Sequence, residues 1–202
     1  MILTHGANSI ERGGGGQTVT IGDKDYKVVT MPDGKVWMAE NLDYKFTGCV
    51  IGASGYSSSE ARGNYYNNDE TTYGWGGEKY GLLYNKPALE SLHNNKSTFF
   101  PGWHIPTQSE WESLLNVVGD FTSGGTALKS PSKWNGDGTT QFELLHAGIM
   151  VSGGFYSGTN ASYLWTKTGD YAINFLTNNT GYSWDSRDSS DCCSIRLVKD
   201  AT

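Results

Sequence analysis

Charged residues, cysteines and long apolar runs are all scarce in this sequence of 202 residues. Only 18% of the residues are charged, and the net charge is −6. Nucleic acid is therefore not expected as a partner, because its phosphates are bound by an excess of Lys and Arg. No apolar run approaches the length of a membrane span, and residues 1–16 lack the basic and apolar regions of a signal peptide. We expect neither a membrane span nor a signal peptide.

The three cysteines, Cys49, Cys192 and Cys193, match neither a disulfide framework nor the spacing of a zinc site. A reactive cysteine needs a neighbouring base or cation that lowers its pKa, and the sequence offers only Arg196. We interpret the adjacent pair as two thiols in a loop, without a nucleophilic or metal-binding role. We expect no metal and no cofactor. Replacing both Cys192 and Cys193 by Ser is predicted to leave the fold and any binding largely intact.

Glycine and aromatic residues are abundant instead. The chain has 27 Gly, 7 Trp and 12 Tyr, which suits a turn-rich domain with aromatic anchors better than a helical bundle. Residues 1–16 are polar and end in four consecutive glycines, so we expect a flexible N-terminal lead. Residues 17–202 are long enough for one packed domain.

Alternating side chains and turn residues predict several short strands. Residues 18–28 alternate around a Gly22 turn, and residues 35–41 follow with Val36 and Met38 on one face and Trp37 on the other. Residues 52–77, rich in Ser, Gly, Asn and Tyr, are predicted to form a long surface loop. Later strands are predicted at residues 142–145, 162–165, 172–176 and 194–198.

Two helices are predicted before these later strands. Pro87 marks the first turn of a helix that runs to His93. Thr107 and Glu110 form a capping box, after which Trp111, Leu114, Leu115 and Val118 recur at helical spacing up to Gly119. A short helical turn is expected at residues 126–130. Helices combined with short strands and long loops predict an α+β fold.

Two polar motifs could carry chemistry but have simpler interpretations. His104, between Trp103 and Ile105, is interpreted as a buried hydrogen-bonding residue rather than a catalytic or metal-binding one. The carboxylates of Asp185, Asp188 and Asp191 could bind Ca²⁺, recognise a basic partner or only solvate a loop. The solvated loop is the default interpretation, and the other two stay open.

The region from Gly153 to Cys193 is rich in Tyr, Ser, Gly, Asp and Asn. Tyr and Trp supply rigid contact area, while Ser, Gly and Asn supply adaptable hydrogen bonds, as in antibody paratopes. An ordinary exposed loop region has a similar composition. This composition alone barely separates a recognition surface from such loops.

A series of tryptophan-containing motifs covers about residues 18–200. In chain order these are Val36–Asp43 (VWMAENLD), Tyr80–Asn85 (YGLLYN), Pro101–Thr107 (PGWHIPT) with Glu110-Trp111, Ala147-Gly148, Leu164–Thr166 (LWT) and Ser194–Lys199 (SIRLVK). The series resembles the Fibrobacter succinogenes major paralogous domain family. That family is similar to the formylglycine-generating-enzyme branch of the C-type-lectin fold, which includes variable proteins of diversity-generating retroelements.

The resemblance implies two helices around a small twisted antiparallel sheet, with the first and last strands close together and a loop-rich face. It does not imply that the chain is a formylglycine-generating enzyme, because the pair of active-site cysteines of those enzymes has no match in this sequence. The Glu-Pro-Asn or Gln-Pro-Asp motif of calcium-dependent sugar-binding lectins is also absent from the sequence.

Retroelement diversification often acts on adenines in AAY codons, which excludes Lys, Glu, Gln, Met and Trp from the products. Residues 169–193 contain no Lys, Glu, Gln or Met, and Trp184 is the single exception. Cys192-Cys193 stands where the family usually has Gly-Phe or a similar pair, as local variation would produce. Loops are poor in the excluded residues in any case, so the two explanations remain open.

These observations favour a non-catalytic binding protein with a variable recognition surface at about residues 150–193. The resemblance extends the hypothesis to a phage or prophage receptor-binding tail protein located on a virion or a cell surface. Its partner would be a protein or cell-surface receptor. The alternatives are a formylglycine-generating-type enzyme and a plain structural surface domain. Ten ligand-binding residues are predicted to cluster on one exposed surface: Tyr156, Thr159, Tyr163, Asp170, Tyr171, Tyr182, Trp184, Asp185, Arg187 and Asp188.

The interior is predicted to rest on four tryptophans, because large aromatic side chains dominate burial where a small sheet must be filled. Trp37, Trp103, Trp111 and Trp165 should all be largely buried.

Overall fold

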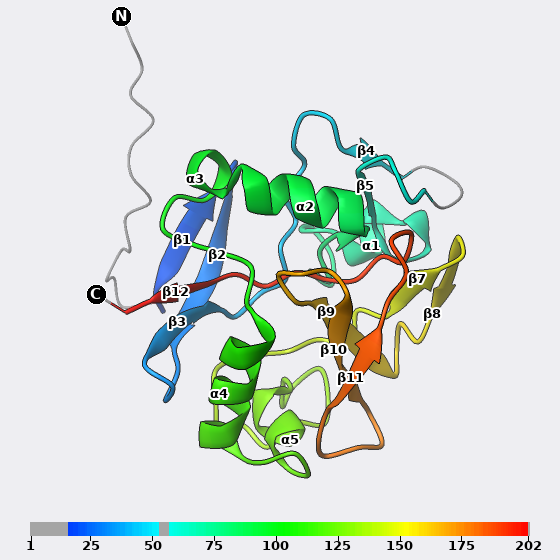
Figure 1. Ribbon diagram of the computed structural model, residues 1–202. Helices are drawn as coiled ribbons and strands as arrows, with labels where there is room; N and C mark the ends of the chain where they lie inside the picture. The colour runs from blue at the N-terminus through cyan, green and yellow to red at the C-terminus, as the bar shows by residue number, and fades with distance from the viewer. Residues whose placement is uncertain (1–15, 53–56, 202) are drawn as a thin grey trace, which may run out of the picture.

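A computed structural model describes residues 16–52 and 57–201 (Figure 1). The predicted N-terminal lead, residues 1–16, lies outside the described residues except for Gly16. The described chain combines helices with several small sheets, so the α+β prediction is confirmed. No helix in the described ranges is long and apolar enough to cross a membrane.

A four-stranded antiparallel sheet joins the beginning and the end of the described chain. Strands β1 (Thr18–Ile21), β2 (Lys24–Thr30), β3 (Lys35–Met38) and β12 (Val198–Asp200) lie in that order. The predicted turn before β3 forms, with Gly34 in the left-handed region at φ 80°. The first and last strands therefore belong to one sheet, where they form its two opposite edges.

Strand β3 separates two parts of the core. Val36 and Met38 pack into the first core cluster, with Tyr26, Trp103 and Trp165, whereas Trp37 packs into the second, with Trp111. The predicted alternation is thus confirmed on both faces. All four predicted core tryptophans are at most 3% exposed, which confirms their burial.

The predicted helices form and are capped as the sequence indicates. Helix α2 (Lys86–Asn94) starts at Asn85, whose side chain accepts a hydrogen bond from the Ala88 amide. Helix α4 (Gln108–Val118) starts with the complete capping box of Thr107 and Glu110. The short turn at residues 126–130 lies slightly earlier, as α5 (Gly124–Leu128).

The prediction of a long surface loop at residues 52–77 is partly wrong. Its described part contains strand β5 (Arg62–Asn64), the 3-10 helix η1 (Tyr66–Asn68) and helix α1 (Glu70–Tyr73). Helix α3 (Lys96–Phe99) was not predicted either. These elements are three or four residues long, too short to show a period in the sequence.

A second sheet carries four of the ten predicted recognition residues, Tyr163, Tyr171, Trp184 and Asp185. It consists of β9 (Ala161–Trp165), β10 (Tyr171–Leu176) and β11 (Ser183–Ser186), with β10 in the centre. Strands β9 and β10 match two predicted strands, while β11 was not predicted. Two smaller groups are β4 (Val50–Ile51), β5 and β6 (Leu83–Tyr84), and the hairpin of β7 (Ile149–Val151) and β8 (Gly154–Tyr156).

The segment 192–194 connects these small sheets. Cys192 forms a bridge with Met150, Cys193 with Tyr84, and Ser194 with Leu164. The predicted strand at residues 194–198 is therefore replaced by isolated bridges, and regular pairing begins only at Val198. The predicted strand at 142–145 is likewise wrong, since only Leu144 forms a bridge there, to Lys129.

His104 and Glu110 join the start of α4 to the sheet. His104 Nε2 lies 2.8 Å from Glu110 Oε1, and the backbone of His104 pairs with Val198. The predicted hydrogen-bonding role of His104 is confirmed, although the residue is partly exposed rather than buried. Burial acts to raise the pKa of Glu110, but hydrogen bonds from His104 and Thr107 outweigh it and lower the pKa to about 2.

We expect this carboxylate to make folding acid-sensitive. A lowered folded-state pKa stabilises the protein above the ordinary value of 4.5, and the stabilisation is lost as the pH falls towards about 2. Glu110→Gln keeps the capping box but loses the charge, so it should cost about 2 kcal/mol at neutral pH and nothing at low pH. Urea unfolding over a pH series measures this. If the free energies of unfolding of wild type and Glu110→Gln changed in parallel with pH, the lowered pKa of Glu110 would be contradicted.

Candidate functional site

The register of the β9–β11 sheet places a polar group on one of its faces. Residues directly opposite each other in antiparallel strands share a face. Tyr163 on β9 and Ser183 on β11 both lie opposite Asn174 on β10. Trp165 and Asp185 likewise lie opposite Ala172. Tyr163, Asn174, Ser183 and Asp185 therefore face the same side.

Arg187, which follows β11, folds over this polar face. Its guanidinium lies 2.5 Å from Asp185 Oδ2 and 3.6 Å from Asp191 Oδ2. The same guanidinium lies 5.2 Å from the centre of the Tyr163 ring, as a cation–π contact. We call Tyr163, Asn174, Ser183, Asp185, Arg187 and Asp191 the Arg187 cluster.

Hydrogen bonds tie the remaining members of the cluster together. Ser183 Oγ donates to Asn174 Oδ1 over 2.6 Å, and Asn174 Nδ2 donates to Asp185 Oδ2 over 3.1 Å. Burial raises the pKa of Asp191 despite the nearby Arg187 charge. The cluster is thus a connected network, and such a network fixes side-chain positions rather than leaving them free.

The turn between β9 and β10 lies next to the Arg187 cluster. The Arg187 amide donates to the Asp170 carbonyl, and Lys86 Nζ at the start of α2 lies 2.8 Å from Asp170 Oδ1. Gly169 has φ 69°, and a Cβ there would come within 2.8 Å of Leu89 on α2. This glycine lets the turn pack against the helix, which holds Asp170 in place.

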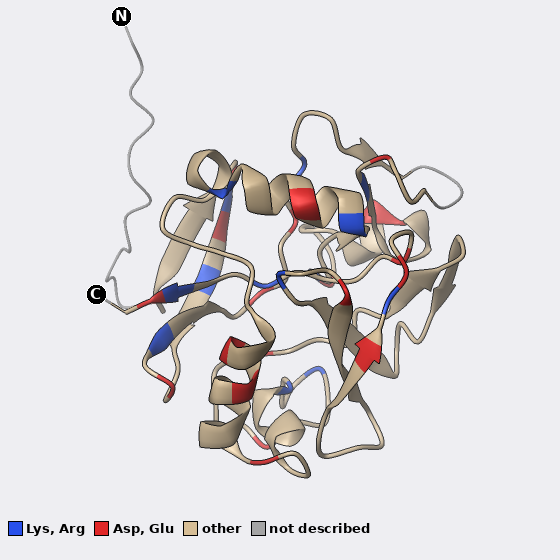
Figure 2. Cartoon of the chain, in the orientation of Figure 1, with Lys and Arg blue, Asp and Glu red and all other residues tan. Residues whose placement is uncertain are grey.

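Several predicted residues meet at this end of the sheet. Asp170, Tyr171 and Asp188 are exposed, while Tyr163, Asp185 and Arg187 are partly buried. We call the sheet end formed by Asp170, Tyr171, Asp185, Arg187 and Asp188 the Arg187 face; within it Tyr171, which lies opposite Ser186, points to the other side of the sheet from Asp185. Figure 2 shows acidic positions on β11 and on the loops at its end. With Asp191 the region has four carboxylates against Arg187 and Lys86, so negative charge is in excess.

The other predicted residues do not join this surface, and the prediction of a single exposed cluster is wrong for them. Tyr182 is only 8% exposed and belongs to the second core cluster, against which Trp184 also packs. Trp184 lies opposite Ile173, on the sheet face away from Asp185. Tyr156 and Thr159 are exposed but precede β9, at the end opposite the β9–β10 turn.

Three members of the Arg187 cluster were not among the ten site residues predicted from the sequence. Asn174 is a polar residue within the apolar run of residues 172–176, and such an interruption is a usable signal. Ser183 gives no comparable signal. Asp191 was noted only as part of an acidic stretch. Among the described residues, no three His, Cys, Asp or Glu side chains are grouped closely enough to hold a metal ion.

The cysteine pair is not in an exposed loop, which corrects the interpretation from sequence. Cys192 and Cys193 are both fully buried, and all three cysteines are free. Burial raises the pKa of Cys192 to about 12 and raises that of Cys193 well above its usual range. Both sulfurs are therefore thiols at neutral pH, and a thiol is a poor nucleophile.

The burial also changes the expected effect of serine substitutions. Cys192 Sγ lies 3.6 Å from the Ser190 carbonyl, so a hydroxyl there has an acceptor. Cys193 packs in the first core cluster, where a hydroxyl would be buried among apolar groups. We expect Cys193→Ser to cost about 1–3 kcal/mol and Cys192→Ser less. Urea unfolding measures both, with Cys193→Ala as the apolar control; equal costs would contradict this packing.

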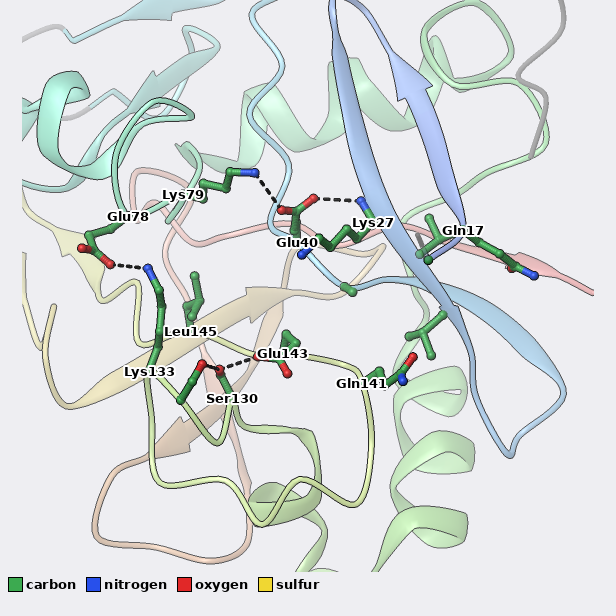
Figure 3. Close-up of a pocket in the computed structure, with 15 residues that line it drawn as sticks. Gln17, Lys27, Glu40, Glu78, Lys79, Ser130, Lys133, Gln141, Glu143 and Leu145 are labelled. Carbon is green, nitrogen blue, oxygen red and sulfur yellow. Dashed lines mark hydrogen bonds and ion pairs between the residues drawn. The ribbon is translucent and has the colours of Figure 1, made fainter. Parts of the chain in front are cut away.

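A separate groove of about 590 Å³ lies between β2 and residues 130–145 (Figure 3). Three Lys and three Glu side chains line it, and four of these six form two ion pairs: Lys79 Nζ lies 3.2 Å from Glu40, and Lys133 Nζ lies 2.6 Å from Glu78. Ser130 also donates to the Glu143 carboxylate. Because the three Lys balance the three Glu, the groove offers a ligand little net charge.

Comparison with known proteins identifies the chain at the level of a family. The sequence profile described as Fibrobacter succinogenes major domain matches residues 33–199. Neither a curated protein nor a solved structure gives a significant match. The matched region spans β3 to β12 and includes the Arg187 cluster. The chain therefore belongs to the Fibrobacter succinogenes major domain family.

Proposed function

We propose that the protein is a non-catalytic binding module that recognises a protein or cell-surface receptor through the Arg187 face. The observation that carries this proposal is the connected Arg187 cluster. It braces a sheet end whose outermost side chains, Asp170, Tyr171 and Asp188, stay exposed. A rigid scaffold that presents exposed loop residues is the usual design of recognition surfaces.

Strand β10 has a buried centre, which belongs to the rigid scaffold, and an exposed end at the proposed binding surface. Ala172, Ile173, Asn174 and Phe175 are buried, while Tyr171 at one end is 46% exposed. Side chains at the exposed end can change without disturbing the buried centre. Exposed Tyr is also among the residues that supply most of the energy at binding interfaces.

The charge of the face favours a basic or neutral partner. Asp185 and Asp191 are partly neutralised by Arg187, whereas no described cation lies within 4.0 Å of the Asp188 carboxylate. Complementary charge speeds association and disfavours acidic partners. An acidic receptor surface would be repelled at this end of the sheet.

In more detail, we propose that the protein is a C-type-lectin-like variable protein, diversified by a retroelement and carried on a phage virion or a cell surface. The codon-restricted composition of residues 169–193 supports this setting. The burial of Tyr182, Cys192 and Cys193 limits variation within that stretch to exposed positions. The formylglycine-generating alternative would need reactive thiols, and burial disfavours the thiolate at all three cysteines.

Binding of the labelled protein to a panel of bacterial cells and purified surface proteins tests the proposal. Wild type should bind saturably to one partner, and Asp170→Ser/Tyr171→Ser/Asp188→Ser should lose at least about tenfold in affinity. The matched control Asp23→Ser/Asp25→Ser/Phe121→Ser removes two carboxylates and one aromatic ring elsewhere. Equal binding by the face variant and wild type would contradict the proposal.

A further inference from the structure

A second groove, of about 610 Å³, lies next to the β9–β10 turn. It is bordered by the end of α2, by α3, by the residues before α4 and by the turn itself. We call it the His93 groove. The ionisable side chains that line it are His93, Lys96, His104, Glu110 and Lys167. Cationic groups therefore outnumber the single carboxylate.

That carboxylate is already fully engaged. Glu110 accepts hydrogen bonds from the Thr107 amide over 2.9 Å and from His104 over 2.8 Å. Its Oε1 also lies 3.3 Å from Lys35 Nζ. Lys35 is shared with Asp200, and Glu110 makes its contacts with Thr107, His104 and Lys35 rather than with Lys96 or Lys167.

The two lysines of the groove have no such compensation. Across residues 16–52 and 57–201, neither Lys96 nor Lys167 has a carboxylate oxygen within 4.0 Å of its ammonium group. Just outside the groove, Lys199 lies over the Trp103 ring at 5.4 Å and adds further positive charge. This concentration of unpaired cations is unusual in a chain with a net charge of −6.

A buried polar atom in the groove also lacks a partner. Nδ1 of His93 is buried and makes no hydrogen bond within the described structure. Burial lowers the pKa of His93, and the charges of Lys96, Lys167 and His104 lower it further. These four groups therefore surround one space. An anion placed there would reduce the repulsion between the lysines.

We propose that the His93 groove binds a ligand through its phosphate or sulfate group, held by Lys96 and Lys167 with His93 and Ser97 as further donors. The N-terminus of α4, an eleven-residue helix, adds the positive end of its dipole. The groove volume is in the range of small-molecule sites, so it has room for an organic body beyond the anionic group. This site is separate from the Arg187 face.

Titration of the labelled protein with inorganic phosphate and with glucose 6-phosphate, followed by amide NMR at constant ionic strength, tests the proposal. Saturable shifts should occur around Lys96, Gly102 and Lys167. Lys96→Gln/Lys167→Gln should weaken binding about tenfold or more, because two charge-assisted contacts are lost. Tighter binding of glucose 6-phosphate than of phosphate would show that the groove also contacts the organic part of the ligand. Equal binding of the two would show that it recognises the anion alone.

The control is Lys45→Gln/Lys133→Gln, which changes the net charge equally but removes lysines paired with Glu70 and Glu78 outside the groove. Its affinity for phosphate should stay within about twofold of wild type. Absence of saturable shifts with both probes would overturn the proposal. So would equal weakening in the two double variants, because binding would then follow net charge alone.

Discussion

Trp111→Ala should lower the free energy of unfolding by about 3–5 kcal/mol, the cost typical of truncating a buried tryptophan. Trp111 is fully buried on α4, and its ring centre lies 4.8 Å from that of Trp37 and 6.0 Å from that of Phe142. These rings join the helix to β3, so the substitution opens a cavity between two elements. Urea unfolding followed by far-UV circular dichroism measures the loss.

A second substitution at the same position separates packing from hydrogen bonding. The indole N–H of Trp111 is buried and makes no hydrogen bond within the described structure. Trp111→Phe removes that unpaired group while keeping an aromatic ring, so it should cost clearly less than Trp111→Ala. If Trp111→Ala cost under about 1 kcal/mol, the core arrangement described here would be contradicted.

Arg196→Met should destabilise the fold by a similar amount, about 3–5 kcal/mol. Arg196 is fully buried, and its guanidinium donates to Asn41 Oδ1 and to the carbonyls of Met38, Phe142 and Glu143. Methionine fills much of the volume but leaves these acceptors unsatisfied. The loss is measured by the same urea unfolding experiment.

The cost should come from this hydrogen-bonded arrangement rather than from charge alone. Burial lowers the pKa of Arg196 to about 9, so the side chain remains protonated at neutral pH. Arg196→Lys keeps a charge but cannot satisfy four separate acceptors, and it should also destabilise the protein. Lys45→Met, which breaks an exposed ion pair with Glu70, should cost under about 1 kcal/mol. Wild-type stability in Arg196→Met would contradict the predicted role.

The two proposed sites differ in charge although they flank the same β9–β10 turn. Asp170 belongs to the acidic Arg187 face, while Lys167 lines the cationic His93 groove. Lys86 fixes the Asp170 side of the turn, and the Lys167 amide donates to the Pro106 carbonyl on the other side. The turn is therefore held from both sides, and each site can be altered by substitutions that leave the other intact.

Local signals predicted the elements whose determinants are close in sequence. The capping box of Thr107 and Glu110 set the start of α4, and the alternation around Trp37 gave the orientation of β3. Both depend on residues at most a few positions apart. Such features can be read without knowing the tertiary structure.

Features set by distant pairing could not be predicted in the same way. Cys192 and Cys193 follow a polar stretch typical of a loop, but bridges to Met150 and Tyr84 bury them in the centre of the domain. Strand β11 has the sequence SWDS, which lacks a regular apolar alternation. The faces of Trp184 and Asp185 likewise depend on the register with β10, which sequence alone did not give.

The most direct test of the binding assignment is an exchange of exposed side chains on the Arg187 face. Asp170, Tyr171 and Asp188 would be replaced by the residues of a second family member, while the Arg187 cluster, Cys192 and Cys193 are kept. Affinity for each protein's receptor and the Tm of the exchange variant are then measured. We predict that the variant binds the second receptor, loses its own and keeps a nearly unchanged Tm. An unchanged receptor preference, or a large fall in Tm, would contradict the account.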